Sequence, residues 1–451
     1  MRPLNDNTKI SFESAQVSES DLLNLAKIAD VKIKVLTLDD NPNLLIFPRD
    51  LHQYGDEISD SNIISLADNQ ISTNNIMGFV GVNDTQLDIR SRFAQDDGRD
   101  YFLHYMLQKV FTINLFDIPH TSNQEQIFDF LLYLFPYYLN KALAQGLFKK
   151  YRSFERNDAN IRGTIDVSRH IRQNIPFRGT VAYTVRTHSY DNEITQLIRH
   201  TIEYIKSKPY GSSILNNDSE TKRSVAEIIS ATQTYKQQDR TKIIGQNLRP
   251  VRHPYFGAYT DLQKICLQIL RHETIKYGQE KDKVYGILFD GAWLWEEYLA
   301  GVLINYGYTH AENNTRKNPI TLYNGNLRYP DFYKSKKIKV FRYGNPIPEE
   351  NDVLDAKYKM LDSNSVDRND IHQIVTYMHI LPSKRCGLVF PSKYTTSAKS
   401  SFNVYGMGGT IRIFGLQVYH DSNDDHSDFD FISYAKKMEQ LENKLVNNIN
   451  Q

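Results

Sequence analysis

Short apolar segments separated by polar turns run through the first 95 residues of the chain. Apolar side chains at every second position, with β-branched residues among them, favour strands that bury one face. Asn83-Asp84 separates two such segments and is typical of a hairpin turn. We therefore predict a β-rich domain over residues 1–95, with its best strands at 31–36, 44–47, 76–82 and 85–89.

Longer apolar segments with helical spacing follow, and they predict a mainly helical middle domain over residues 96–280. The segment at 124–149 is crowded with aromatic and leucine side chains, which base stacking or a packed core would both explain. A stripe at helical spacing favours the core. The expected helices lie at 100–116, 124–149, 193–206, 220–238 and 256–277.

The last part of the chain, residues 281–451, mixes the two periodicities. Its expected order is a helix at 291–306, strands at 326–333 and 351–358, a helix at 367–380 and a strand at 386–390. An acidic stretch at 421–430 precedes an amphipathic helix at 432–446. The whole pattern predicts an α+β multidomain protein: a β-rich N-terminal region, a helical middle and a C-terminal α/β domain with a mixed sheet flanked by helices.

The amino-acid composition limits which classes of protein the sequence can encode. Forty per cent apolar and 12% aromatic residues suffice for packed cores. The 54 basic and 53 acidic residues nearly cancel, whereas a protein that grips nucleic acid unaided usually carries a basic excess. Cys266 and Cys386, the two cysteines, lie in apolar surroundings, so we expect buried thiols and no zinc site. Without a signal-peptide pattern or a long apolar run, we expect a cytoplasmic protein that spans no membrane.

Two basic stretches are candidate contact surfaces. Residues 149–156 mix lysine and arginine with aromatic side chains, and further arginines follow up to Arg178. Such a mixture suits a DNA backbone or a protein partner, and an arginine-rich surface helix would show the same pattern. Arg90 and Arg92 would share one face of a strand, either as a basic contact or as a solvated face.

Asp355 and Lys357 carry the clearest candidate chemistry. One residue separates them, so on a strand they point to the same side. A carboxylate can hold a divalent cation that polarises a phosphate and activates water, and a neighbouring lysine can orient that water or offset developing charge. This spacing alone is common on solvated strand edges. The surrounding residues therefore decide whether the pair is catalytic or only a solvated face.

Further polar residues accompany this pair in a fixed order along the chain. Glu296 and Glu297 lie in the first predicted helix of the last domain, and Asp331 follows Pro330 before the Asp355 strand. Gln373 and Tyr377 are four residues apart on the next predicted helix and so share a face. The Glu, Pro-Asp, Asp-x-Lys and Gln-x-x-x-Tyr order resembles the PD-(D/E)xK nuclease superfamily and its RecB-like branch.

The nuclease resemblance implies roles for these residues. Glu296, rather than Glu297, resembles the acid of the first core helix because Trp295 precedes it. Glu296, Asp331 and Asp355 would bind Mg²⁺, for which Mn²⁺ would substitute. Asp331, Asp355 and Lys357 would act in catalysis, with Gln373 and Tyr377 steadying the site or the DNA backbone. Cleavage would leave a 5′-phosphate.

The resemblance extends beyond the nuclease motifs. Residues 161–166 (IRGTID), 189–193 (SYDNE) and the segment 77–93 are similar to the McrC family, the endonuclease subunits of McrBC-type restriction systems directed at 5-methylcytosine. This resemblance implies a Mg²⁺-dependent endonuclease of anti-phage defence that cuts double-stranded DNA. It also implies a partner, an McrB-like AAA+ GTPase hexamer, which binds the GTP and whose hydrolysis this chain would stimulate. We expect residues 1–95 to contact that partner.

Absent motifs limit the alternatives. The sequence has no G-x-x-x-x-G-K-[ST], H-E-x-x-H or G-x-S-x-G, which removes nucleotide-hydrolase, zinc-protease and α/β-hydrolase interpretations. The glycine-rich residues 406–410 favour a hairpin turn over a phosphate loop. Two alternatives stay open: a non-catalytic activator or assembly subunit with a nuclease-like fold, and a free-standing RecB-like repair nuclease.

Overall fold

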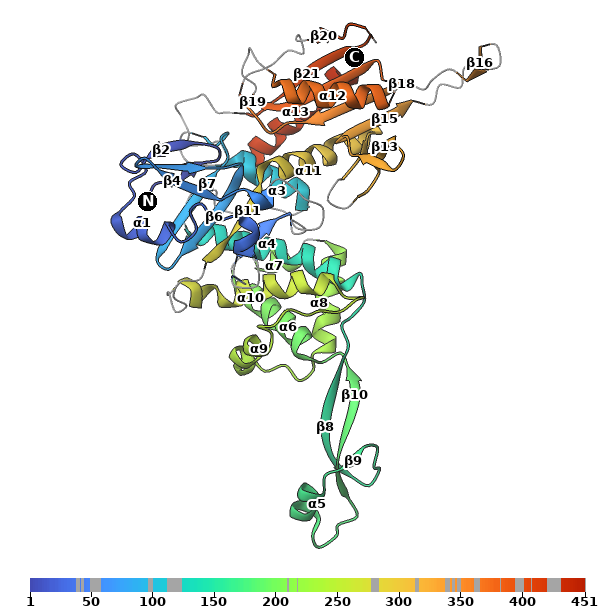
Figure 1. The fold of residues 1–451 in the computed structure, drawn as a ribbon. Coiled ribbons are helices and arrows are strands. Elements are labelled where there is room, and N and C mark those ends of the chain that lie inside the picture. The colour runs from blue at the N-terminus through green and yellow to red at the C-terminus, as the bar shows by residue number, and fades with distance from the viewer. Residues whose placement is uncertain are drawn as a thin grey trace. The chain divides into compact units, whose positions relative to one another are not determined.

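The computed structural model describes residues 1–37, 41, 44–48, 58–95, 100–111, 124–208, 211–216, 218–276, 284–312, 316–336, 341–342, 345–346, 350–360, 366–381, 383–393, 401–406, 408–419 and 431–450. Its contacts divide the chain into two compact units, Met1–Ile127 with Gly278–Gln451 and Phe128–Tyr277. Helices and sheets both occur, as predicted for an α+β protein (Figure 1). The finer division at residues 95 and 280 stays a prediction.

A sheet of five described strands organises the N-terminal part of the first unit. β6 and β7 form an antiparallel hairpin with Asn83 at φ 52° in its turn, which confirms the predicted strands and turn. β11 pairs antiparallel with β6 and parallel with β3, so a strand from far along the sequence completes this sheet. The strand order is β1 (Leu4–Asn5), β7 (Thr85–Arg90), β6 (Ile76–Val82), β11 (Val284–Asp290) and β3 (Leu44–Phe47).

The predicted strand at 31–36 is wrong, because Ile33–Thr37 form the short helix α2. Ile33 and Leu36 are both buried, and residues three apart lie on one face of a helix. Their apolar spacing therefore satisfies a helix as well as a strand, and so short a segment cannot distinguish the two periods. Other small elements nearby are β2 (Lys9–Ser11), β5 (Gln70–Thr73), β4 (Ile64–Ala67), α1 (Glu19–Leu25) and η1 (Ile58–Asp60).

Arg92 has neither role proposed for it from the sequence. Its side chain is buried, and its Nη2 lies 2.5 Å from Oδ2 of the buried Asp6. The guanidinium also lies 4.7 Å from the centroid of the Tyr358 ring. The arginine therefore contacts both the segment after β1 and the residue that follows Lys357. It is an internal link of the first unit, whereas Arg90 remains half-buried on β7.

Three helices of the first unit meet at Glu442. Its Oε1 accepts hydrogen bonds from Tyr105 of α3 (Tyr101–Phe111) at 2.8 Å and from Tyr298 of α11 (Gly291–Leu303) at 2.6 Å. Glu442 itself lies on α13 (Phe431–Asn450), so the C-terminal amphipathic helix packs within this unit. The described parts of the helices predicted at 100–116, 291–306 and 432–446 are confirmed. The acidic segment 421–430 lies outside the described residues.

A second sheet of the first unit carries the candidate chemistry. Its described strands run in the order β12 (Thr309–His310), β15 (Phe332–Lys336), β18 (Glu350–Ala356), β19 (Arg385–Ser392), β21 (Thr410–Gln417) and β20 (Ser401–Asn403). β15 is antiparallel to β18, while β18, β19 and β21 are parallel neighbours, so the sheet is mixed as predicted. α12 (Arg368–Ile380) packs on β18 and β19, and its Ile374 joins their buried core.

The strand predicted at 326–333 is interrupted. β14 (Asn326–Arg328) pairs with β13 (Ile320–Tyr323) in a separate hairpin, and β15 begins only after Asp331. Pro330 has no N–H to donate to a sheet, which suits its place between the two strands. The glycine-rich turn is confirmed between β20 and β21, where Gly406, Gly408 and Gly409 have positive φ. A further short pair is β16 (Phe341–Arg342) with β17 (Asn345–Pro346).

The second unit is mainly helical, as predicted for the middle of the chain. The helix predicted at 193–206 is found as α6 (Glu193–Lys206), whose buried face includes Leu197 and Ile202. The aromatic and leucine stripe at 131–135 is buried on α4, which confirms the core interpretation for its described side chains. The other helices are α4 (Gln124–Leu143), α7 (Gly211–Leu215), α8 (Ser219–Ala231), η2 (Gln237–Asp239), α9 (Arg240–Gln246) and α10 (Ala258–Lys276).

An arm extends from these helices within the second unit (green in Figure 1). β8 (Lys150–Asp158) and β10 (Val181–Ser189) pair antiparallel over their whole length, and β9 (Thr164–Ile165) and α5 (Val167–Asn174) lie at the far end. Residues 150–156 of the basic stretch therefore lie on a strand, whereas Arg169 and Arg172, which continue it, lie on the helix α5. Among the helices described, none is both long and apolar enough for a membrane span.

Candidate active site

Asp331 and Asp355 lie next to each other where β15 begins and β18 ends. Phe332 pairs with Leu354 across the two antiparallel strands, which brings the preceding aspartate opposite Asp355. The main-chain N–H of Ala356 donates a hydrogen bond of 2.6 Å to Oδ2 of Asp331. The sheet register therefore brings together two carboxylates that are 24 positions apart in the sequence.

Asp355 is a fully buried carboxylate with few polar contacts. Its side chain has 0% exposure, and among the described residues neither of its oxygens accepts a well-aligned hydrogen bond. The Nζ of Lys357 lies 2.7 Å from Oδ2 and supplies the nearest positive charge. Burial, together with the neighbouring Asp331, raises the pKa of Asp355 to about 8. Lys357 therefore does not fully offset the cost of ionising two adjacent buried aspartates.

Lys357 is held between the sheet and α12. Its Nζ donates a hydrogen bond of 3.0 Å to Oε1 of Gln373. Gln373 in turn donates through Nε2 to the hydroxyl of Tyr377 at 3.2 Å, and this hydroxyl donates to the carbonyl oxygen of Tyr329 at 3.3 Å. Burial opposes the charged form of the lysine, but Asp355 and Asp331 outweigh it, so the pKa of Lys357 is raised. The lysine keeps its charge, and the predicted Gln-x-x-x-Tyr pair orients it.

Glu296 is the glutamate of α11 on which the charges of the two aspartates act. Asp290 caps this helix by accepting a hydrogen bond of 2.9 Å from the N–H of Ala292. Trp295 is fully buried and donates through Nε1 to the carbonyl oxygen of Val389 at 3.3 Å, which fixes the helix on the sheet. Burial and the charges of Asp331, Glu297 and Asp355 raise the pKa of Glu296 well above its usual value.

These carboxylates suit a divalent cation. Carboxylate oxygens are the ligands that Mg²⁺ prefers, and a bound cation would favour the ionised form of Asp355. Burial also raises the pKa of Asp331, although Lys357 and the N–H of Ala356 oppose the shift. In the described part of the chain, no group of three histidine, cysteine or acidic side chains lies close enough together to hold a metal ion. The chemistry of Glu296, Asp331 and Asp355 fits a divalent cation, which would draw their carboxylates together. Binding of such a cation stays a prediction.

Sequence reasoning missed two residues beside this site. Asp370 is buried on α12 and lies 4.0 Å from Nζ of Lys357 through Oδ1 and 2.8 Å from Nζ of Lys359 through Oδ2. It precedes Gln373 by three positions and Tyr377 by seven, so the helical period would have found it. His310 donates to the carbonyl oxygen of Asp331, and no spacing signal could have found it because it comes from a two-residue edge strand.

The end of the arm presents apolar side chains to solvent. Its two most exposed are Phe177, at 69%, and Ile175, at 65%. Exposed apolar residues that cluster in this way mark protein contact surfaces more often than DNA contacts, which are polar and basic. Arg169 of α5 is buried and donates through Nη2 to the carbonyl oxygen of Tyr183 at 2.6 Å. We define the arm tip by its exposed apolar residues Ile161, Ile165, Val167, Ile171, Ile175 and Phe177.

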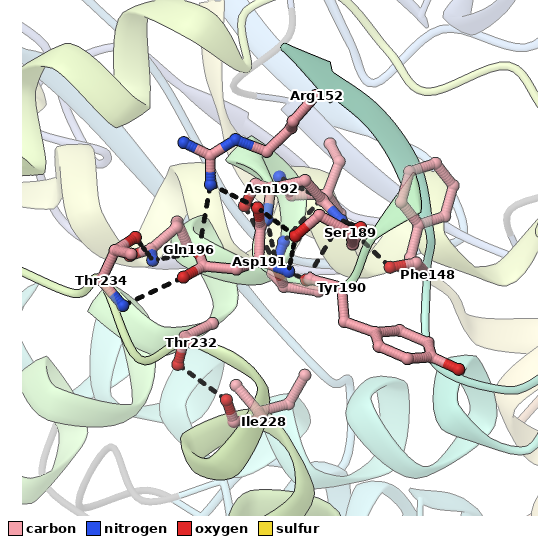
Figure 2. A network of polar contacts seen from close by, with 12 residues as sticks. Phe148, Arg152, Ser189, Tyr190, Asp191, Asn192, Gln196, Ile228, Thr232 and Thr234 are labelled. Atoms are coloured by element: carbon pink, nitrogen blue, oxygen red, sulfur yellow. Dashed lines mark hydrogen bonds and ion pairs between the residues drawn. The ribbon is translucent and has the colours of Figure 1, made fainter. Parts of the chain in front are cut away.

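A polar network fixes the base of the arm to the helices of the same unit (Figure 2). The Asn192 side chain caps α6 and donates to the carbonyl oxygens of Phe148, Ser189 and Tyr190. Asp191 accepts from Nε2 of Gln196 at 2.6 Å and from the N–H of Thr234 at 3.0 Å. Both strands of the arm are thus tied to α6 where the chain enters and leaves it.

Known proteins resemble this chain in sequence and in fold. A family model described as McrBC 5-methylcytosine restriction system component matches residues 71–391. No curated protein sequence matches the chain. A solved chain from the refined half-complex of a tetradecameric assembly of Thermococcus gammatolerans McrB AAA+ hexamers with bound McrC superposes with a TM-score of 0.54. The two are 14% identical, and the match covers 99% of each chain, which shows a shared fold.

A second solved chain, from the cryo-EM structure of the Thermococcus gammatolerans McrBC complex, is 14% identical and covers 67% of this chain and 87% of its own length. Its TM-score is 0.35. The family model alone spans well over half of the sequence, from the β6–β7 hairpin through the arm to β19. The chain therefore belongs to the family of McrBC 5-methylcytosine restriction system components.

Proposed function

We propose that this chain is the Mg²⁺-dependent DNA endonuclease subunit of a modification-dependent restriction complex. The observation that carries the proposal is the buried Asp331–Asp355 pair with Lys357 beside it, at the end of two adjacent strands. The element order α11, β15, β18, α12 and β19 supports it, because this is the order expected for a PD-(D/E)xK nuclease core. A solely structural role would not explain two adjacent buried carboxylates beside a single lysine.

Glu296, Asp331 and Asp355 would hold the cation, with Mn²⁺ able to replace Mg²⁺. When bound, such an ion polarises the scissile phosphate and lowers the pKa of a coordinated water. The protein residues supply position and charge. Asp331 is held through Oδ2 by the N–H of Ala356, so the sheet itself orients one ligand. Asp355 is oriented by its place on the buried parallel strand β18.

Lys357 would offset the negative charge that builds up on the phosphate and orient the attacking water. Its raised pKa keeps it an ammonium ion, which suits charge compensation better than proton abstraction. Gln373 fixes its Nζ through a hydrogen bond, and Tyr377 fixes Gln373. The loss of Gln373 should therefore lower the cleavage rate through a misplaced lysine.

An McrB-like AAA+ GTPase hexamer is the proposed partner, and GTP would bind to that partner. The family match and the nearly neutral charge of the chain support a subunit that depends on a partner for its grip on double-stranded DNA. The solved chain with the shared fold comes from an assembly of McrB AAA+ hexamers with bound McrC. The apolar arm tip is the surface that best fits a protein contact, and residues 1–95 remain a second candidate.

Cleavage of methylated plasmid tests the proposal. The chain is incubated with its GTPase partner, GTP and Mg²⁺, and the ends of the products are analysed. We expect double-strand breaks with 5′-phosphates, loss of cleavage when EDTA removes the metal, and recovery on adding Mg²⁺ or Mn²⁺. Full GTPase stimulation without any cleavage would instead identify a non-catalytic activator. Equal cleavage without the partner would identify a free-standing nuclease.

A further inference from the structure

Tyr358 is a buried aromatic residue directly after Lys357 that the chemistry proposed above does not use. The N–H of Lys357 donates to the carbonyl oxygen of Val389 at 2.9 Å, which continues the pairing of β18 with β19. The lysine side chain contacts α12 through Gln373, whereas the tyrosine side chain contacts the N-terminal sheet. Two neighbouring residues therefore connect the candidate site with another part of the first unit.

Several groups of the N-terminal sheet hold the Tyr358 ring. Its hydroxyl donates to Sδ of the fully buried Met77 on β6 at 3.3 Å. The guanidinium of Arg92 lies 4.7 Å from the ring centroid, and the Phe93 ring meets it edge-to-face with centroids 6.0 Å apart. Arg92 is itself fixed by its ion pair with the buried Asp6. Residues on β6 and just after β7 thus determine where this ring lies.

The same ring packs against the first residue of α11. A Cβ added to Gly291 would lie 2.7 Å from Cε1 of Tyr358, so a larger residue there would push the ring out of its place. The N–H of Gly291 donates to the carbonyl oxygen of Asn75 at 2.8 Å, and the side-chain oxygen of Asn75 accepts from Arg92. Glu296 lies on this helix. A single ring therefore contacts the start of one element of the candidate site, while its main chain continues another.

We propose that Tyr358 is a positioning residue that holds Lys357 and the start of α11 in place against the N-terminal sheet. The inference rests on the proposed nuclease function, and it gives the N-terminal sheet a role in cleavage besides any contact with a partner. A displacement of the reacting groups by about 1 Å can lower a rate about 100-fold. An aromatic residue that only fills space would instead affect stability and leave the turnover of the folded protein unchanged.

Tyr358→Leu in the full chain tests the inference, with methylated plasmid, the GTPase partner, GTP and Mg²⁺ present. We expect kcat for cleavage to fall about tenfold to 100-fold, while KM for DNA and the stimulation of GTP hydrolysis stay within about twofold of wild type. Tyr358→Phe keeps the ring and loses only the hydroxyl contact with sulfur, so it should cut nearly as fast as wild type.

Tyr434→Leu is the matched control. Tyr434 is a similarly buried tyrosine of the same unit, but its ring contacts Tyr101 of α3 and Tyr419. The folded Tyr434→Leu variant should therefore keep the wild-type kcat, even where its unfolding temperature falls as far as that of Tyr358→Leu. Thermal unfolding of every variant shows whether it is folded at the temperature of the assay.

Hydrogen exchange gives a readout that does not depend on activity. The amides of Gly291 and Lys357 are bonded to the carbonyl oxygens of Asn75 and Val389. Both amides should exchange faster in Tyr358→Leu than in wild type, because local opening becomes easier once the ring is removed. Tyr434→Leu should leave the exchange of these two amides unchanged.

Gly291→Ala approaches the same contact from the other side and keeps the test open if Tyr358→Leu does not fold. Its added methyl group should displace the ring and lower kcat in the same way. The double variant should cut no more slowly than Tyr358→Leu alone, because the two substitutions act on one contact.

The outcomes separate this inference from the nuclease proposal. Wild-type kcat in folded Tyr358→Leu, an equal fall in Tyr434→Leu, or equal losses of cleavage and GTPase stimulation would overturn the positioning role and leave the nuclease proposal intact. If the wild-type chain cuts no DNA with its partner present, the nuclease proposal fails and this inference fails with it. A selective fall in kcat with faster exchange at Gly291 and Lys357 supports the inference.

Discussion

Buried charged side chains in the first unit differ in how they are compensated. Asp6 is matched by the guanidinium of Arg92, and Asp100 accepts hydrogen bonds from Ser91 and from the N–H of Leu103. Asp355 has a lysine close by but no well-aligned hydrogen bond among the described residues. The first two aspartates therefore behave as parts of the fold, whereas the third is the better candidate for a functional residue.

The Asp6–Arg92 pair should be important for the stability of the first unit. Arg92→Ala leaves a buried carboxylate without its partner, which typically costs about 3–5 kcal/mol of unfolding free energy. Arg90→Ala is the control two positions earlier on the chain, where the half-buried side chain should contribute within about 0.5 kcal/mol. Chemical denaturation measures both variants. A similar small loss in the two would contradict the internal role of Arg92.

Asp100 should make stability depend on pH. Burial raises its pKa from 3.8 to about 6, so the folded state binds this proton more tightly than the unfolded state. The associated stabilisation is complete below about pH 4 and is lost as the pH rises to about 6, with a size of about 3 kcal/mol. Unfolding of Asp100→Asn, compared with wild type across this range, should show the slope reduced by this contribution. A slope equal to that of the wild type would contradict the assignment.

At the scale of elements, the long periodic segments were predictable and the short ones were not. The fourteen-residue helix α6 was predicted with its bounds, because its apolar spacing runs over several turns and Asn192 caps it. The segment 31–36 is too short to separate a helix from a strand, and it forms α2. Pairing between distant segments has no local signal, so the place of β11 between β6 and β3 appears only in the structure.

Gly286 of β11 tests how closely that strand is packed. Its φ is +151°, and an added Cβ would lie 2.2 Å from the carbonyl oxygen of Phe79 on β6. Gly286→Ala should therefore lower the unfolding free energy by about 2–4 kcal/mol. Gly301 in α11 has open space around it, so Gly301→Ala should stabilise the chain by about 0.5–1 kcal/mol. Thermal unfolding that shows both substitutions neutral would contradict this view of β11.

At the scale of the whole chain, the grouping of the acids, the lysine and the helix pair was predictable because their types and order resemble a nuclease pattern, and their roles stay a prediction. The structure brings Asp331, Asp355, Lys357, Gln373 and Tyr377 into contact through one sheet and one helix. The arm was not predictable, since its charged strands resemble a surface helix in sequence. Deleting residues 1–95 would remove the partner strands of β11, so single substitutions test partner binding better than that deletion.

The arm tip should carry part of the contact with the GTPase partner. Val167→Ser with Phe177→Ser removes two exposed apolar side chains and should reduce GTPase stimulation about tenfold or more, since buried interface anchors are often worth over 1 kcal/mol each. Leu248→Ser is the control, because Leu248 is 53% exposed in the same unit but outside the arm. GTP hydrolysis is measured against the concentration of this chain. Unchanged stimulation by the double variant would exclude the tip as the contact.

The most direct test of the central claim records plasmid cleavage and GTP hydrolysis together for Asp355→Asn. Asp352→Asn, on the same strand but three positions earlier and so on the other face, is the matched control. We predict that Asp355→Asn stimulates the partner's GTPase like the wild type yet cuts no DNA, while Asp352→Asn does both. Cleavage by Asp355→Asn at the wild-type rate would contradict the assignment of this site as the nuclease.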